Sequence, residues 1–238
     1  MADNEVSKIM WVAIVVALAA SIFVIAKPQI TSNTNSVMDT VQNVVKDTKT
    51  SNNLLSNSSW QNGQGTWTAG FNNRFEILKG ESDRPNSAIL HAKPRTTGTQ
   101  QVTQTQLEIP VKEGETYTVS YDYKELNHTM NTNVMVLRIF DFDTPSKAEG
   151  WDEATQTING ESWYARVNSK FEGISTSESL GAPADGFKDW TRLSYTFKAP
   201  SSGYLALIPY DSDTTGNHES FWRELKVEKG SVATPWES

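Results

Sequence analysis

The spacing of hydrophobic and polar positions changes twice along this chain, and the first pattern is an apolar run. Residues 9–26 contain no charged side chain. At about 1.5 Å per residue a helix over this run is roughly 27 Å long, enough to cross the hydrocarbon core of a bilayer. The preceding MADNEVSK is as acidic as it is basic, and the small-residue triplet ALA at 17–19 lies inside the run. We therefore expect a helix that is retained, with a cleaved signal peptide as the alternative.

An amphipathic pattern follows over residues 30–48, where apolar side chains recur in steps of three and four. Pro28 lies between the two patterns and is expected to kink the helix rather than end it. The sequence thus predicts an N-terminal domain, residues 1–48, in which residues 6–48 form one helix roughly 65 Å long. The polar residues 49–53 are the expected linker.

From residue 54 onward the pattern is that of β-strands. The stretch TYTVSYDY, residues 116–123, alternates strictly, and so does TRLSYTFKA, residues 191–199. NVMVLRIFDF, residues 133–142, is more continuously apolar, as expected of a strand buried on both faces. Proline and glycine separate these runs, which is typical of a sandwich or barrel. The predicted fold class is α+β: a long N-terminal α-helix followed by an all-β sandwich head over residues 54–238.

The helical segment, apolar first and striped afterwards, resembles the N-terminal helix of type IV pilins, and it is most similar to tight-adherence pilins with a short polar start. The resemblance implies that residues 9–26 pack with their copies in a filament core and that Val41 and Val44 pack on the head. It also implies that Glu5 pairs with the amino terminus of the neighbouring subunit. Lys8 places a charge early in the helix, which departs from the family, and an acidic residue of a neighbour is its expected partner. The alternative is a signal anchor with a helical stalk.

Four motifs in the head occur in a characteristic order: NNLLSNSSWQNGQGTW, VKEGETYTVSYDYK, DWTRLSYTFKAP and LKVEKGSVATPWES. Together they resemble the jelly roll of carbohydrate-binding modules of families 4 and 9, relatives of which occur in surface and phage tail proteins of Gram-positive bacteria. The resemblance covers residues 53–238. It implies a jelly-roll sandwich in which the first strand, near Leu54, lies close to the last, near Val227. It also implies that Trp67 and Trp190 occupy core positions.

Flat aromatic side chains among amides and carboxylates are the chemistry of a sugar site. The long connection over residues 143–173 offers Trp151, Trp163 and Tyr164 in such surroundings, and we expect glycan contacts there. The alternative is that Trp163 and Tyr164 begin a strand and pack inward. Trp222 alternates away from its apolar neighbours, so we expect it on the opposite face of the sheet, open to solvent or against a neighbouring subunit, and it is a further candidate for glycan contact.

Composition narrows the chemistry. The formal net charge of −7 argues against a nucleic-acid partner, and the absence of cysteine excludes disulfides and thiolate sites. The segment DSDTTGN, residues 211–217, resembles a calcium loop only partly, because it is short and lacks the distal glutamate, and we favour a plain turn. No nucleophile, zinc-protease or phosphate-loop motif occurs, so we expect no enzymatic activity. We expect no cofactor, with a structural calcium of unassigned ligands as the alternative.

Two functional hypotheses follow. The first is a structural subunit of an extracellular pilus-like filament: a homopolymer that leaves the membrane on assembly and displays adhesive heads. The alternative is a membrane-anchored surface carbohydrate-binding module that acts as a monomeric adhesin. A phage tail component is a third reading, against which the long apolar helix speaks. The first two place the head outside the cell, at its surface.

Overall fold

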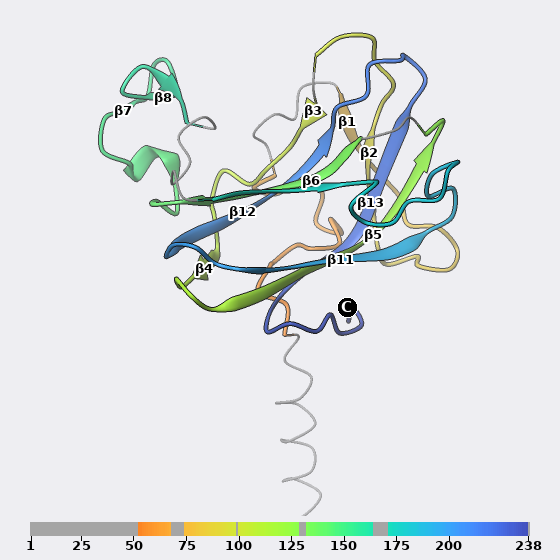
Figure 1. The fold of residues 1–238 in the computed structure, drawn as a ribbon. Coiled ribbons are helices and arrows are strands. Elements are labelled where there is room, and N and C mark those ends of the chain that lie inside the picture. The colour runs from red at the N-terminus through yellow and green to blue at the C-terminus, as the bar shows by residue number, and fades with distance from the viewer. Residues whose placement is uncertain (1–51, 68–73, 99, 129–131, 164–170, 238) are drawn as a thin grey trace, which may run out of the picture. The chain divides into compact units, whose positions relative to one another are not determined.

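The computed structural model describes residues 52–67, 74–98, 100–128, 132–163 and 171–237 (Figure 1). Apart from a 3-10 helix at Pro145–Lys147, all the regular secondary structure of these residues is β-strand, and they contain no α-helix. The predicted α+β class is therefore wrong for the described part of the chain, which is all-β. None of its helices is long and apolar enough to cross a membrane. The helix expected over residues 1–48, with Glu5, Lys8, Val41 and Val44, lies outside the described residues.

Two antiparallel sheets form the sandwich expected of the head. The first has five strands in the order β1 (Phe75–Leu78), β2 (Ile89–Ala92), β13 (Glu219–Lys229), β5 (Thr116–Leu126) and β11 (Thr191–Lys198). The second runs in the order β10 (Glu172–Thr176), β6 (Asn133–Phe140), β12 (Gly203–Asp211) and β3 (Gln100–Gln101), with β4 (Ile109–Val111) also paired to β12.

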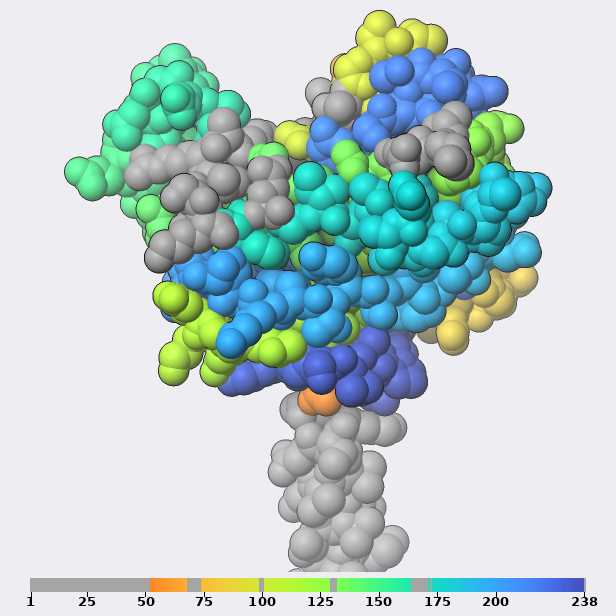
Figure 2. Space-filling view, viewed as in Figure 1, coloured from red at the N-terminus to blue at the C-terminus, as the bar shows by residue number. Residues whose placement is uncertain are grey.

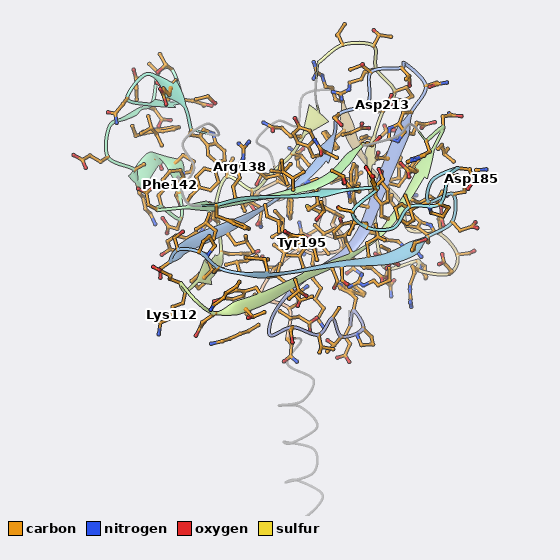
Figure 3. The ribbon with its side chains drawn as sticks, in the orientation of Figure 1. Lys112, Arg138, Phe142, Asp185, Tyr195 and Asp213 are labelled. Carbon is orange, nitrogen blue, oxygen red and sulfur yellow. The ribbon has the colours of Figure 1, made fainter. Side chains whose placement is uncertain are left out.

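The core lies between the two sheets and follows the predicted alternation. Tyr117, Val119, Tyr121 and Tyr123 of β5 all belong to the core cluster, whereas Ser120 and Asp122 bind Arg192 on the outer face. This arrangement confirms the alternation predicted for TYTVSYDY. Tyr195 of β11 packs against the same core and points between the sheets in Figure 3. Burial of this many large apolar side chains is the main favourable contribution to the stability of the sandwich.

Trp222 belongs to this core, against the prediction. Its side chain is fully buried, and its indole N–H donates to the Val134 carbonyl at 3.0 Å. The reason is a β-bulge: opposite β5 the register of β13 shifts between Arg223 and Lys226. One extra residue reverses the alternation, so Trp222 and Leu225 both face inward although one number is even and the other odd.

The segment before β1 follows the last strand, as the resemblance implied. The Leu54 N–H donates to the Val227 carbonyl at 2.8 Å, and the Leu225 N–H donates to the Ser58 carbonyl at 3.0 Å. The side chain of Asn53 accepts from the Val227 N–H at 2.9 Å. This contact brings the start of the head beside β13 and beside the C-terminal residues that follow it.

A small three-stranded sheet, β7 (Trp151–Asp152), β8 (Thr157–Ile158) and β9 (Glu161–Ser162), projects from the sandwich as a separate lobe (Figure 2). We call residues 141–163 the insertion. It is held by a second apolar cluster on the outer face of the second sheet, where Ile158 and Trp163 pack with Val136, Phe140 and Ile208.

Candidate functional site

The bulge in β13 changes which side chains lie on the outer face of the first sheet. Glu224 is the extra residue, and its backbone φ of +55° lies in the left-handed region that side-chain-bearing residues adopt infrequently. A bulge of this kind redirects side chains and is often found beside functional sites. Here it allows two consecutive residues, Arg223 and Glu224, to line the same hollow on the outer face.

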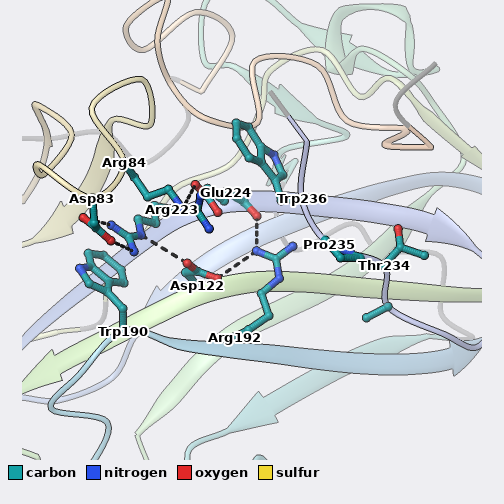
Figure 4. A pocket seen from close by; sticks show the side chains of 11 residues that line it. Asp83, Arg84, Asp122, Trp190, Arg192, Arg223, Glu224, Thr234, Pro235 and Trp236 are labelled. Atoms are coloured by element: carbon teal, nitrogen blue, oxygen red, sulfur yellow. Dashed lines mark hydrogen bonds and ion pairs between the residues drawn. The ribbon is translucent and has the colours of Figure 1, made fainter. Parts of the chain in front are cut away.

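That hollow is a groove with a main cavity of 570 Å³ and an adjoining one of 170 Å³ (Figure 4). Strands β5, β11 and β13 supply its floor, the loop of residues 79–88 supplies one wall, and C-terminal residues 233–236 supply the other. Both cavities are lined by Asp83, Arg84, Glu224 and Trp236, so they are two parts of one depression. We call it the groove.

Ion pairs fix the floor of the groove. Arg223 binds Asp83 through both terminal nitrogens, at 2.8 and 3.2 Å, and binds Asp122 through Nε at 3.3 Å. Arg192 reaches the other oxygen of Asp122 at 3.2 Å and donates to the backbone carbonyl of Glu224 at 2.7 Å. The hydrogen bonds from Arg223 lower the pKa of the Asp83 carboxyl below its ordinary value. Charge-assisted pairs of this geometry hold the floor in one arrangement.

Two half-buried tryptophans belong to the groove. The Arg223 guanidinium lies 4.2 Å from the centre of the Trp190 ring, a stacking geometry typical of arginine. The Trp190 indole N–H donates to Glu81 at 2.7 Å, and that of Trp236 donates to Ser58 at 3.2 Å. Trp190 is therefore not the core residue that the resemblance implied, whereas Trp67 is fully buried.

Buried polar residues of β13 hold the C-terminal wall in place. The Lys226 ammonium donates to the Pro235 carbonyl at 2.9 Å, and the Glu228 carboxylate accepts from the Thr234 N–H at the same distance. Lys226 and Glu228 also pair with each other at 3.1 Å. The wall that carries Trp236 is thus tied to the sheet on which the groove lies.

Glu224 is the least solvated acid of the groove. Its side chain is only 3% exposed, and burial, followed by the nearby charge of Asp122, raises the pKa of its carboxyl. Arg84 Nε lies 3.2 Å from Oε1 of Glu224, and the Arg84 side chain is 57% exposed. Oε1 has no hydrogen bond of good geometry among the described residues. A buried acceptor without a hydrogen bond costs free energy, and a donor that reaches it from the groove recovers this cost.

The residues predicted to contact a glycan do not meet in this groove. Trp163 is 6% exposed and packs with its ring centre 5.6 Å from that of Phe140, as the inward-packing alternative stated. Trp151 lies half-buried on the insertion, where its indole N–H donates to Glu153 at 2.8 Å. Trp222 is in the core, and Tyr164 lies outside the described residues.

The DSDTTGN segment forms turns rather than an evident ion site. The Asp211 carboxylate accepts from the Asp213 N–H at 2.8 Å, and the Asp213 carboxylate accepts from the Thr215 N–H at 2.8 Å. In the described ranges, no three metal-ligating side chains are arranged to hold an ion.

No family model matches this chain. It is similar to a tail fiber protein of Enterococcus phage phiEF24C, with 36% identity over 187 residues, which is 77% of this chain and 9% of that protein. The chain therefore spans about a tenth of the length of this curated relative.

Solved structures give more distant likenesses. They include a family 16 carbohydrate-binding module (TM-score 0.45, 14% identity, covering 74% of this chain and 99% of that one). A second is the module TmCBM61 in complex with β-1,4-galactotriose (TM-score 0.44, 10% identity, covering 75% of this chain and 99% of that one). A third is the enzymatically active domain of bacteriophage CBA120 tailspike protein 4 (TM-score 0.46, 12% identity, covering 74% of this chain and 21% of that one). None of these matches is a pilin, and they give no support to the predicted pilus subunit.

Proposed function

We propose that this protein is a surface-displayed adhesin module that binds a glycan in the groove on its first sheet. The observation that carries the proposal is the groove itself, in which half-buried Trp190 and Trp236 accompany a rigid floor of paired carboxylates and guanidinium groups. Saccharides present apolar C–H faces that pack on aromatic rings and hydroxyl groups that both donate and accept hydrogen bonds. A largely pre-formed hollow with a few convergent polar groups suits such a ligand.

The likeness to a phage tail fiber protein supports a module displayed on an outer surface, because it extends over most of this chain. The role is binding rather than turnover, because the carboxylates of Asp83 and Asp122 are already occupied by Arg223 and Arg192. The site we propose differs from the one expected in the insertion, where the buried Trp163 has little surface left for a ligand.

The test is a glycan array probed with the full chain, followed by titration of any ligand found. We expect the wild-type protein to bind at least one glycan and Trp236→Ala to bind it about tenfold more weakly, the equivalent of roughly 1.4 kcal/mol. Trp236→Phe keeps an aromatic face and should recover most of the affinity. The thermal midpoint of both variants should stay near that of the wild type because Trp236 is half-exposed.

Two results would contradict the proposal. The first is a folded wild-type protein that binds no glycan on the array. The second is glycan binding that survives both Trp236→Ala and Trp190→Ala, since both tryptophans line the groove.

A further inference from the structure

We propose that Glu224 determines which saccharides the groove accepts: its buried carboxylate takes a hydroxyl donor from an uncharged saccharide and repels one that carries a carboxylate or phosphate group. This inference rests on the proposed function and names the ligand class for the same site. It follows from the ion pairs that the charged side chains of the groove already form with one another.

The arginines of the floor are committed to partners within the protein. Arg223 is shared between Asp83 and Asp122. Arg192 donates to Asp122, to Ser120 and to the backbone of Glu224. An anion that bound either of these arginines would have to displace a carboxylate that the protein itself supplies, and it would do so beside the other acids of the groove. Like-charge juxtaposition of this kind is a common device for rejecting wrong ligands.

Glu224 differs from the other two acids because one of its carboxylate oxygens accepts no hydrogen bond of good geometry from the described residues. Asp83 and Asp122 each accept two hydrogen bonds from arginine side chains. Oε1 of Glu224 is buried without a hydrogen bond of good geometry, and its ion-pair partner Arg84 is mostly exposed. A carboxylate has about four acceptor sites, so a ligand hydroxyl can bind Glu224 while a neighbouring ligand oxygen accepts from Arg84.

The bulge explains why an acid occupies this position. In a regular strand, alternation would carry the Glu224 side chain toward the core, because Trp222 two residues earlier faces inward. The bulge turns it outward to line both cavities of the groove. The surroundings also resist negative charge there, since burial and Asp122 raise the pKa of this carboxyl.

The experiment compares two forms of one ligand. The polysaccharide that the wild-type protein binds on the array is tested before and after chemical oxidation of its primary alcohols to carboxylates. We expect the oxidised form to bind the wild-type protein at least tenfold more weakly. Glu224→Gln keeps the shape of the side chain and removes its charge, so it should reduce this preference to less than about threefold, in proportion to the lost repulsion.

Glu161→Gln is the matched control, because it makes the same change of net charge at an exposed position of the insertion. It should leave the preference as it is in the wild type. Arg84→Gln provides a second variant at a 57% exposed side chain, should Glu224→Gln fail to fold. Removal of that cation should widen the preference for the neutral form.

The inference is overturned if the array ligand is itself anionic, if Glu224→Gln keeps the full preference, or if Arg84→Gln abolishes it. Each of these outcomes leaves glycan binding in the groove intact. A wild-type protein that binds no glycan is a different result, because it removes the proposed function and this inference together.

Discussion

Both outer faces of the sandwich carry tryptophan side chains, but the two faces surround them with different neighbours. On the second sheet, aromatic side chains pack on one another, and the insertion covers them. On the first sheet, charged side chains pair across the strands, and two half-buried tryptophans line a groove. A tryptophan with apolar neighbours is buried in the core, whereas the two tryptophans beside the ion-paired floor stay partly exposed. The surroundings of a tryptophan therefore indicate its role better than its presence in a long loop.

The largest effect on one face alone is expected from a substitution of Trp163. Trp163→Ala should cost about 3 to 5 kcal/mol of packing free energy, because the ring fills the cluster between the insertion and β6. The insertion should then become sensitive to limited proteolysis, while the groove, on the other sheet, keeps its ligand affinity. Urea unfolding and protease mapping measure the first effect, and titration measures the second. Equal loss of both would mean that the two faces are not independent.

An ionic cluster inside the sandwich, none of whose residues lines the groove, should make the stability of the protein depend on pH. His218 is 1% exposed and lies 3.2 Å from Asp211 and 3.1 Å from Glu125. Burial opposes its charge, but hydrogen bonds and the charges of these two acids raise the pKa of His218 to about 9. Arg95 and His128 also face the cluster, at 3.9 Å from Asp211 and 2.9 Å from Glu125.

Because the pKa of His218 is raised on folding, its stabilisation is complete below pH 6.5 and is lost as the pH rises through about 9. The difference of about 2.5 units corresponds to roughly 3 kcal/mol. Burial acts against the Glu125 charge, yet the hydrogen bond from His218 lowers the pKa of Glu125, so that contribution disappears only in acid below its ordinary value of 4.5. Urea midpoints between pH 6 and 10 test this, and His218→Gln should flatten the alkaline decline.

How much the sequence predicts depends on whether a feature is local. The alternation in β5 was predicted correctly because period-two patterning reports directly on the faces of a strand. The pairing near Leu54 and Val227 joins distant parts of the chain, and it was predicted correctly only through the family resemblance. The side of Trp222 was wrong because a single bulge shifts the phase of the alternation. The available signal was the pair of adjacent charged residues, Arg223 and Glu224, which interrupts the alternation of apolar and polar residues in this strand.

The groove itself could not be predicted from the sequence. Its residues come from a loop near position 83, from β5, β11 and β13, and from the C-terminal segment, and only the fold brings them together. Trp236 was quoted as part of a family motif and was not weighed as a ligand contact. The α+β class was wrong for the described residues because it took its helical part from the first 48 positions alone.

The ion-paired side of the comparison is tested by Arg223→Leu. Arg223 is 4% exposed, so its removal leaves Asp122 with Arg192 alone and takes the stacking partner from Trp190. Loss of one partner of a buried pair costs several kcal/mol, but Asp83 is 56% exposed and recovers its hydration, so we expect about 2 kcal/mol. Glycan affinity should fall as well. An unchanged urea midpoint would show that the floor is not held by these pairs.

The smallest effect is expected at Trp151, the half-buried tryptophan of the insertion. Trp151→Ala removes a ring that packs only at the edge of the second cluster and donates one exposed hydrogen bond to Glu153, so its cost should be about 1 kcal/mol or less. Titration should give the wild-type glycan affinity, in contrast to Trp236→Ala. If Trp151→Ala lost the ligand and Trp236→Ala kept it, the roles of the two faces would be reversed. The ligand would then bind at the insertion, and the paired charges of the first sheet would be purely structural.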